Sequence, residues 1–295
     1  MPFPLGIGII TYNRRATVAA TIERVRALTR EPNAAVVVAD DGSSDGTPGM
    51  LREMRVPVVT GINMGIAWNK NRALFVLSQL LGCETVILLE DDTRPNEAGW
   101  ETHWITAARR WGHVNYAGGW MRNHFLSGSG TPDDPVRATM VSAQCAAYSR
   151  RALTYAGYFD PRFTGYGHEH VEHTRRMIRL GYGGGVEQRN GKEQVIFHLI
   201  TGGVAVVEST SHGNAAAADR NLLLARQLMA EEGYRAPWGN DSQLRQFRSE
   251  AESSFADDPV RFALHAAPAD RVVEANPSPA LLRGLLERLR GAAPR

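Results

Sequence analysis

Residues 86–95 read Val-Ile-Leu-Leu-Glu-Asp-Asp-Thr-Arg-Pro. The apolar run at the start is typical of a buried strand, and it ends on three adjacent carboxylates. Three like charges at one strand end repel each other, so the cluster indicates a bound cation. Mg²⁺ and Mn²⁺ prefer carboxylate and phosphate oxygens, and open α/β sheets bind ligands at the carboxyl ends of their strands. The segment therefore predicts a metal–diphosphate site; the alternative is an acidic turn that only ends a strand.

The first half of the chain alternates short apolar runs with amphipathic stretches. We expect strands at Leu5–Thr11, Ala35–Ala39, Val56–Thr60 and Thr85–Leu89. We expect a helix that ends near Leu28 and is capped by Asn13 or Thr17, and further helices at Ser44–Met54 and Gly65–Leu81. Strands that alternate with helices in this way predict an α/β fold with a mixed, mainly parallel sheet flanked by helices.

The second half is less regular. We expect helices at Trp100–Trp111, His168–Leu180 and Asp219–Glu232, and strands at Asn115–Trp120, Ala138–Tyr148 and Val195–Leu199. Residues 277–290 form an amphipathic pattern whose leucines share one side. We expect this helix to dock on the domain, with a partner or a membrane surface as the alternatives. The domain prediction is 1–208 for the α/β domain, in halves 1–95 and 96–208, and 209–295 for a helical C-terminal extension.

The composition of the chain argues against several classes of protein. The chain has 295 residues, 43% of them apolar, and a formal charge of +2, so it shows no strong attraction to nucleic acid. Cys83 and Cys145 stand in no paired-ligand pattern, which argues against a zinc site or disulfide framework. We find neither a signal-peptide pattern nor an apolar stretch of about 18 residues. We therefore expect a cytoplasmic protein, at most peripheral to the inner face of the membrane, and leave a homo-oligomer open.

A second acidic loop follows the second expected strand, where residues 40–47 read Asp-Asp-Gly-Ser-Ser-Asp-Gly-Thr. Its carboxylates face the same sheet edge as residues 90–92, and a carboxylate can accept from a pyrimidine ring N–H or a ribose hydroxyl. Gly42 and Gly46 permit tight turning. We expect Asp41 to contact a ligand, whereas Asp45 and Thr47 fit the ordinary capping of a helix.

Residues 36–47 resemble the nucleotide-binding signature of family-two glycosyltransferases, which have the GT-A fold. Three further segments occur in the family's order. Residues 10–14 (Ile-Thr-Tyr-Asn-Arg) are similar to its opening strand and loop, and residues 63–73 to its Asn-x-Gly…Asn-x-Ala helix. Residues 90–92 resemble the Asp-x-Asp motif that holds a divalent metal on the donor diphosphate. The resemblance covers residues 5–200 and implies a GT-A (Rossmann-like) fold.

The resemblance also implies roles for individual residues. The nucleoside pocket would be lined by Thr11, Asn13, Arg14, Asp41 and Asn71. In the metal motif, Asp92 is the preferred direct ligand and Asp91 would contact the ribose. Glu90 stands where the family has Asp, and its extra methylene group makes a water-mediated contact an alternative to direct ligation. The implied cofactors are Mn²⁺ or Mg²⁺ and a nucleotide-sugar donor, a UDP-sugar in the first place.

A fifth segment, residues 157–173, resembles the family's Gly-Gly-Phe-Asp…Gly-x-Gly-x-Glu-Asp stretch, in which a carboxylate is the general base. Glu169 occupies the Glu position, but His170 stands where the family has its catalytic Asp. Either Glu169 is the base, with His170 supporting it or contacting the diphosphate, or His170 is itself the base, since imidazoles titrate near neutral pH. We favour Glu169, because a carboxylate needs no change of chemistry from the family. His173 fits a structural role.

His198 is a polar residue in an apolar strand and needs a partner there. Metal-dependent GT-A enzymes often complete the metal site with a His after the base segment, so the resemblance makes His198 a candidate third metal ligand and His212 a weaker one. Trp120, Tyr166 or Trp68 could form a platform for a sugar ring, although core packing is the commoner role of such residues.

The resemblance implies a metal-dependent, inverting glycosyltransferase that moves a sugar from a nucleotide-sugar to a glycan, a lipid-linked sugar or a protein-borne sugar. Two alternatives remain. A sugar-phosphate nucleotidyltransferase would also need acidic residues and a metal, but residues 5–15 lack the Gly-rich phosphate loop expected of one. A non-catalytic nucleotide- or carbohydrate-binding module would not need the intact acidic clusters and Glu169.

Overall fold

The computed structural model describes residues 3–207, 215–231, 233–255 and 262–264. Within them, the main sheet has ten strands in the order β3-β2-β1-β4-β9-β6-β11-β8-β7, with β10 paired to β11. Strands β3, β2, β1 and β4 are parallel, β9 runs antiparallel between β4 and β6, and β12 and β5 form a separate two-stranded sheet. The sheet is thus mixed, and its N-terminal half is parallel, as expected.

The strands are β1 (Leu5–Thr11), β2 (Ala34–Asp40), β3 (Val58–Thr60), β4 (Thr85–Glu90), β5 (Thr93–Pro95), β6 (His113–Tyr116), β7 (Phe125–Ser127), β8 (Val136–Ala138), β9 (Cys145–Ser149), β10 (Gly184–Arg189), β11 (Lys192–Ile200) and β12 (Val204–Val206). The α-helices are α1 (Arg15–Leu28), α2 (Thr47–Glu53), α3 (Ile66–Phe75), α4 (Glu101–Trp111), α5 (Arg150–Ala156), α6 (Glu169–Arg179), α7 (Ala215–Leu228) and α8 (Asp241–Phe255). A π-helical turn, η1 (Val76–Leu80), continues α3, and η2 (Gly119–His124) is a 3-10 helix.

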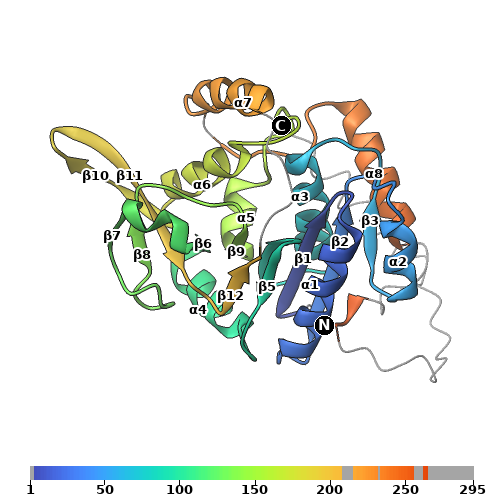
Figure 1. Ribbon diagram of the computed structural model, residues 1–295. Helices are drawn as coiled ribbons and strands as arrows, with labels where there is room; N and C mark the ends of the chain where they lie inside the picture. Colours follow the sequence, from blue (N-terminus) through green and yellow to red (C-terminus); the bar gives the residue numbers. More distant parts are fainter. Residues whose placement is uncertain (1–2, 208–214, 232, 256–261, 265–295) are drawn as a thin grey trace.

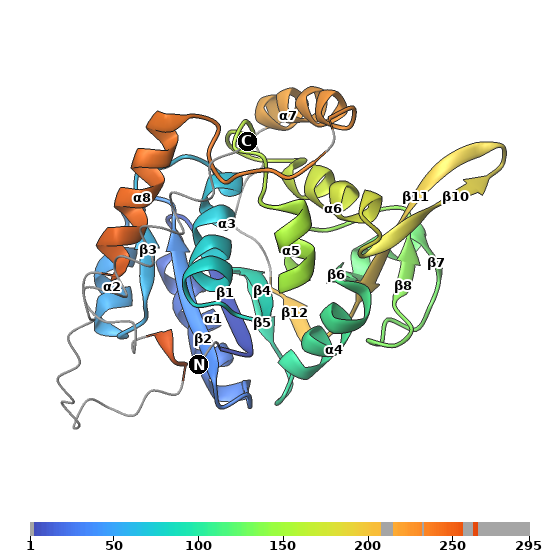
Figure 2. The ribbon, with the colours of Figure 1, turned by 180° about the vertical axis from the view of Figure 1, so that it is seen from behind.

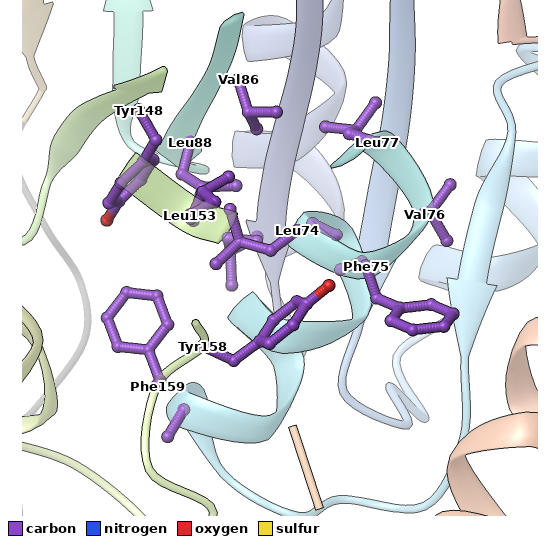
Figure 3. Close-up of a cluster of buried hydrophobic side chains, with 14 of the residues drawn as sticks. Leu74, Phe75, Val76, Leu77, Val86, Leu88, Tyr148, Leu153, Tyr158 and Phe159 are labelled. Atoms are coloured by element: carbon purple, nitrogen blue, oxygen red, sulfur yellow. The ribbon is translucent and has the colours of Figure 1, made fainter. Parts of the chain in front are cut away.

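Helices cover both faces of the sheet and enclose an apolar core on each face, and a smaller third cluster lies around β8, β11 and η2 (Figures 1 and 2). Helices α1, α2 and α4 pack on one face, and α3, η1, α5 and α6 pack on the other. Figure 3 shows part of the second core, where Leu74 and Leu77 lie near Leu88 of β4. A Cβ on Gly8 of β1 would lie 3.0 Å from the Cβ of Ala73, so this glycine allows α3 to pack closely on the central strands.

The described part of the C-terminal extension packs into the second core. Helix α7 lies against α6, and α8 runs along β3 (Figures 1 and 2). Phe247 of α8 makes edge-to-face contacts with Trp68 and Phe75 of α3, at centroid distances of 5.3 and 5.2 Å. The expected helix at residues 277–290 lies outside the described residues. None of the helices in the described ranges combines the length and apolar character needed to span a bilayer.

The expected elements of the first half are confirmed to within a few residues, but the expected capping by Asn13 or Thr17 is wrong: the N-cap residue of α1 is Arg14, and its side chain makes no capping hydrogen bond. Two expectations in the second half are also wrong. Residues 138–148 do not form one strand: Val136–Ala138 belongs to β8, which pairs with β7 and β11, whereas β9 begins at Cys145 and pairs with β4 and β6. The expected strand Asn115–Trp120 ends at Tyr116, and η2 begins at Gly119. Apolar composition runs through both breaks, so it does not reveal where the chain changes partners.

Candidate active site

The predicted acidic residues meet at one edge of the sheet. In the parallel register Thr11 lies beside Asp40, and Ile10 lies beside Glu90, so β1, β2 and β4 end together. Two backbone hydrogen bonds extend this alignment beyond the strands: Asp41 N donates to Thr11 O at 3.1 Å, and Asp91 N donates to Ile10 O at 3.2 Å. Parallel pairing therefore brings residues 40–41 and 90–92 to the same place, as the sequence predicts.

Asp91 organises this edge. Its Oδ2 accepts a 2.7 Å hydrogen bond from Thr11 Oγ1, and its Oδ1 accepts from Arg14 Nη1. Burial raises the pKa of Asp91 to about 7, against the hydrogen bond from Thr11 and the charge of Arg14, which both lower it. Both carboxylate oxygens are thus engaged by the protein, and the predicted ribose contact of Asp91 stays a prediction.

Asp92 and Arg14 leave complementary polar atoms unsatisfied. Asp92 Oδ2 accepts from Arg14 Nη1 at 3.1 Å, but Asp92 Oδ1 is buried without a hydrogen-bond partner among the described residues. Within the same described ranges, Nε and Nη2 of Arg14 are also buried and unpartnered. Buried polar groups are nearly always paired, so the Arg14 nitrogens need an acceptor, and Asp92 Oδ1 needs a donor or a cation, from outside the described residues. A metal bound to a diphosphate has both.

Glu90 turns toward a lysine that the sequence prediction missed. Lys70 Nζ on α3 lies 3.2 Å from Glu90 Oε1 and 3.1 Å from Glu169 Oε1, and its side chain is 2% exposed. A sequence signal existed: residues 69–72 are four polar residues in the middle of a helix, and all four are buried. A buried polar run of this kind needs partners, which are here the two glutamates and neighbouring polar groups.

Glu169 and His170 begin α6 beside this lysine. Burial alone would raise the pKa of Glu169, but the ammonium of Lys70 and the His170 ring outweigh it and hold the pKa well below its usual range. His170 Nδ1 lies 3.5 Å from Glu169 Oε1. The imidazole side chain is 21% exposed, against 2% for Glu169. The two candidate bases are therefore neighbours, and only the histidine has substantial access to solvent.

Two further residues of the base segment, Glu172 and His173, make structural contacts. His173 is fully buried and its Nε2 lies 3.0 Å from Gly157 O. Glu172 pairs with Arg176 at 2.9 Å inside the core. These contacts hold α6 against the preceding segment and agree with the structural role expected of His173.

Asp41 is held by a network that reaches the C-terminal extension. It accepts from Met64 N and Gly65 N at 3.0 and 2.9 Å and from Arg72 Nη1 at 2.7 Å. Arg72 in turn donates to Glu250 of α8 at 2.9 and 3.1 Å. Burial raises the pKa of Asp41, and the two N–H groups and Arg72 only partly offset it. Arg72 and Glu250 were not predicted; the buried polar run on α3 signals the first, and no local pattern signals the second.

Two predicted pocket residues, Asn13 and Asn71, bind backbone groups. Asn13 has a positive φ of 51°, and its Oδ1 accepts a 2.7 Å hydrogen bond from Ser44 N, which joins the loops after β1 and β2. Asn71 is fully buried; its Nδ2 donates to Phe159 O and its Oδ1 accepts from Phe159 N, both at 2.9 Å. The structure therefore corrects the prediction for Asn71, which fixes α3 to the segment before α6 and does not line the pocket.

His198 lies away from the acidic cluster. It lies on β11 opposite Arg137, and its ring centroid is 4.7 Å from that of Trp111. It also lines a cavity together with Thr85, the first residue of β4. Glu90 is the last residue of β4, so the two positions are at opposite ends of that strand. The structure does not bring His198 together with Glu90 and Asp92, which corrects the predicted ligand set. His212 lies outside the described residues.

The described residues contain no group of three His, Cys, Asp or Glu side chains arranged to hold a metal ion. Sites that use one or two carboxylates together with substrate phosphates need no such group. Of the aromatic platform candidates, Trp68 is buried and donates to Glu250, whereas Trp120 and Tyr166 are 60% and 54% exposed. Tyr166 lies three residues before Glu169, and burial and the charges of Glu90 and Glu169 raise its pKa.

Comparison with known proteins agrees with this geometry. Residues 7–123 match the family model described as Glycosyl transferase family 2. The mannosyltransferase PcManGT from Pyrobaculum calidifontis, solved with GDP-Man and Mn²⁺, superposes with a TM-score of 0.53 at 15% identity, over 100% of this chain and 79% of that one. GalNAc-T7, solved with UDP, GalNAc and Mn²⁺, superposes with a TM-score of 0.52 at 13% identity, over 98% of this chain and 55% of that one. S. aureus TarS superposes with a TM-score of 0.51 at 14% identity, over 85% of this chain and 44% of that one. Curated protein sequences gave no match. These structures confirm the expected GT-A fold.

Proposed function

Because residues 7–123 of this chain match the family model described as Glycosyl transferase family 2, we propose that the protein is a metal-dependent glycosyltransferase with a nucleotide-sugar donor. The observation that carries the proposal is the pair of unsatisfied groups at the sheet edge, Asp92 Oδ1 and the Nε and Nη2 of Arg14. Asp92 Oδ1 needs a cation and Arg14 needs an anion, and a metal–diphosphate supplies both.

The residues present fit a divalent metal. Asp92 would hold it through its unpartnered oxygen, and Glu90, whose side chain is 24% exposed, would contribute directly or through water. When bound, the metal neutralises charge on the leaving diphosphate. Arg14 donates to the same diphosphate from its two unpartnered nitrogens, which strengthens binding of the leaving group as its charge grows.

Asp41 and Thr11 form the proposed nucleoside pocket. Asp41 Oδ2 accepts one hydrogen bond, from Gly65 N, and retains capacity for a second from a ring N–H. A uracil ring carries such an N–H group. Asn13 and Arg14 close the pocket from the loop after β1, which Ser43 and Ser44 hold in place. We therefore propose a UDP-sugar as the first donor to test.

The sequence favours Glu169 as the general base; we propose instead that His170 is the base, and that Glu169 positions it. Glu169 is ion-paired and its pKa is well below the usual range, so its carboxylate has little affinity for a proton. His170 is more exposed, and its Nδ1 lies 3.5 Å from Glu169 Oε1 but has no hydrogen-bond partner among the described residues, which leaves Nε2 for the acceptor. The acceptor oxygen would attack the anomeric carbon as the bond to the diphosphate breaks, and the hydroxyl proton would pass to His170. This route inverts the anomeric carbon.

The acceptor is proposed as a glycan, lipid-linked sugar or protein-borne sugar. Tyr166 and Trp120 offer exposed rings that can stack on a sugar face. A cytoplasmic setting is proposed as well, and the two cysteines support it because both are buried, free thiols.

A donor panel tests the proposal. The purified chain is incubated with UDP-glucose, UDP-GlcNAc, UDP-galactose and GDP-mannose, with Mn²⁺ or with EDTA, and nucleoside diphosphate release is measured. We expect release from one UDP-sugar, and we expect both EDTA and the D92N substitution to abolish that release. Saturable donor binding without release under any condition would favour a binding module. Pyrophosphate release from a nucleoside triphosphate and a sugar phosphate would favour a nucleotidyltransferase.

A further inference from the structure

A cavity lies at the opposite end of β4 from the acidic cluster. Its volume is about 590 Å³, in the range of small-molecule sites. Thr85 at the start of β4 lines it, and Glu90 at the end of β4 marks the acidic cluster, so about 16 Å of strand separates them. We call it the arginine pocket and define it by its charged and aromatic residues, which are Glu84, Arg109, Arg110, Trp111, Arg150, Arg151, Tyr182 and His198.

The lining carries excess positive charge. Four arginines face one glutamate among the lining residues. Arg110 pairs with Asp133 at 2.6 Å, and Arg150 pairs with Glu84 at 3.3 Å. Arg109 and Arg151 form no ion pair with any residue in the described ranges. A guanidinium group presents two parallel N–H donors that match a carboxylate or a phosphate, so these two arginines are available for an anion.

Fixed aromatic side chains form the walls. Trp111 Nε1 donates to Pro132 O at 2.8 Å, and the tryptophan ring contacts the His198 ring edge-on. His198 Nδ1 is buried and has no hydrogen-bond partner among the described residues. Tyr182 lies so close to Gly112 that a Cβ there would be 2.2 Å from its ring. The pocket thus combines rigid ring surface, an unpartnered imidazole nitrogen and unpaired guanidinium groups.

We propose that the arginine pocket is a second binding site, for an anionic sugar unit. Its phosphate or carboxylate would pair with Arg109 and Arg151, and its ring would pack against Tyr182, because the Arg110 guanidinium already lies 5.1 Å from the Trp111 ring centroid. A phosphate ion alone would leave most of a cavity of this volume empty. The choice of a sugar rests on the proposed function; the anionic charge rests on the pocket itself. Bound acidic glycan would keep the enzyme on its acceptor and raise the local acceptor concentration.

Calorimetric titration at low ionic strength tests this site. The full chain, held in saturating UDP and Mn²⁺ to block the donor site, is titrated with glucose 1-phosphate, glucuronate and neutral glucose. We expect saturable binding of at least one acidic sugar and no binding of glucose. The relative affinity of the two acids shows whether phosphate or carboxylate is the preferred anion.

Matched charge variants locate the binding. R109E/R151E should weaken binding of the acidic sugar by about tenfold or more, because both guanidinium contacts become repulsive. R52E/R245E makes the same change of charge at two exposed arginines elsewhere and should retain affinity. Equal binding to both variants, binding of glucose as tight as that of the acids, or no binding of either acid would overturn the proposal. The titration requires no turnover, so failure of the donor panel leaves its result interpretable.

Discussion

Lys70 places its ammonium 3.1 Å from Glu169 Oε1, and both side chains are 2% exposed. The same nitrogen lies 3.2 Å from Glu90 Oε1. Burial alone would lower the pKa of Lys70, but the charges of Glu169 and Glu90 outweigh it and raise the pKa, so the ammonium stays charged. One buried cation thus joins the strand end that carries the acidic cluster to the helix that carries both candidate bases.

Replacing Lys70 by Met should destabilise the protein and reduce turnover together. Removing one partner leaves Glu169 as a buried, unpaired carboxylate, which costs about 3–5 kcal/mol in comparable sites. Urea unfolding and donor turnover measure the two effects. Lys192→Met, in the exposed part of β11, is the control and should change neither. An unchanged unfolding midpoint for K70M would show that the ion pair contributes nothing to stability.

The stabilising effect of this pair should vanish in acid. The pKa of Glu169 is lower in the folded chain than the value of about 4.3 in an unfolded chain, so the pair stabilises the fold at pH values above the unfolded pKa. That stability is lost as the pH falls toward the folded pKa. A double-mutant cycle of K70M and E169Q should therefore give a coupling free energy at pH 7 that shrinks when the pH falls below about 4. Coupling that is constant with pH would contradict the ion-pair description.

The two candidate bases can be separated by conservative variants. His170→Asn should lower kcat by about 10²- to 10⁴-fold, the usual contribution of a general base, while UDP affinity is retained. Glu169→Gln should lower kcat less and alter the pH profile, because it only positions the imidazole. The measurements are kcat against pH and UDP titration for both variants. The reverse pattern, with E169Q inactive and H170N active, would assign the base to Glu169.

The sequence predicts the strand ends well because parallel strands share an edge. Alternating strands and helices imply parallel pairing, and parallel pairing aligns Asp40, Asp41 and residues 90–92 regardless of their distance along the chain. The split of residues 138–148 between β8 and β9 was not predictable, because it depends on which strand each half pairs with. Long-range pairing leaves no mark on local apolar composition.

The candidate-site residues also divide into those that a local motif predicts and those that depend on long-range packing. Asp92 and Arg14 follow from motifs at strand ends, whereas Asn71 occupies a motif position but binds the backbone of Phe159, 88 residues away. The link between Arg72 and Glu250 spans 178 residues. Such contacts are decided by how helices dock on the sheet, so a motif identifies a residue as important without showing which group it binds.

His198 should play no part in metal binding. It lies beside Trp111 at the far end of β4 from Asp92. We expect His198→Asn to retain Mn²⁺ affinity in the presence of UDP, measured by electron paramagnetic resonance of free Mn²⁺, and Asp92→Asn to lose it. His212→Asn, measured in parallel, tests the weaker sequence candidate. Loss of Mn²⁺ affinity in H198N with an unchanged unfolding midpoint would restore the original ligand set.

Glu250 should control nucleotide affinity from outside the family-matched segment. It accepts two hydrogen bonds from Arg72, and Arg72 donates to Asp41 in the proposed nucleoside pocket. Glu250→Gln keeps the size of the side chain but removes its charge, and we expect a loss of about 1–3 kcal/mol in the Arg72 contacts. The KM for the donor should rise more than kcat falls, because Asp41 binds the nucleoside and takes no part in proton transfer.

The neighbouring residue Glu252 supplies the control for this last variant. It lies on the same helix, its side chain is 44% exposed, and its ion pair with Arg248 is 3.7 Å long. Glu252→Gln should therefore leave donor KM, UDP affinity and the unfolding midpoint unchanged. For E250Q, UDP titration should show weaker binding while Mn²⁺ affinity, set by Asp92, changes little. E250Q could instead lower kcat, Mn²⁺ affinity and UDP affinity to the same extent. That result would mean that α8 supports only the general stability of the fold. A selective loss of UDP affinity would show that the C-terminal extension acts on the donor pocket through Arg72.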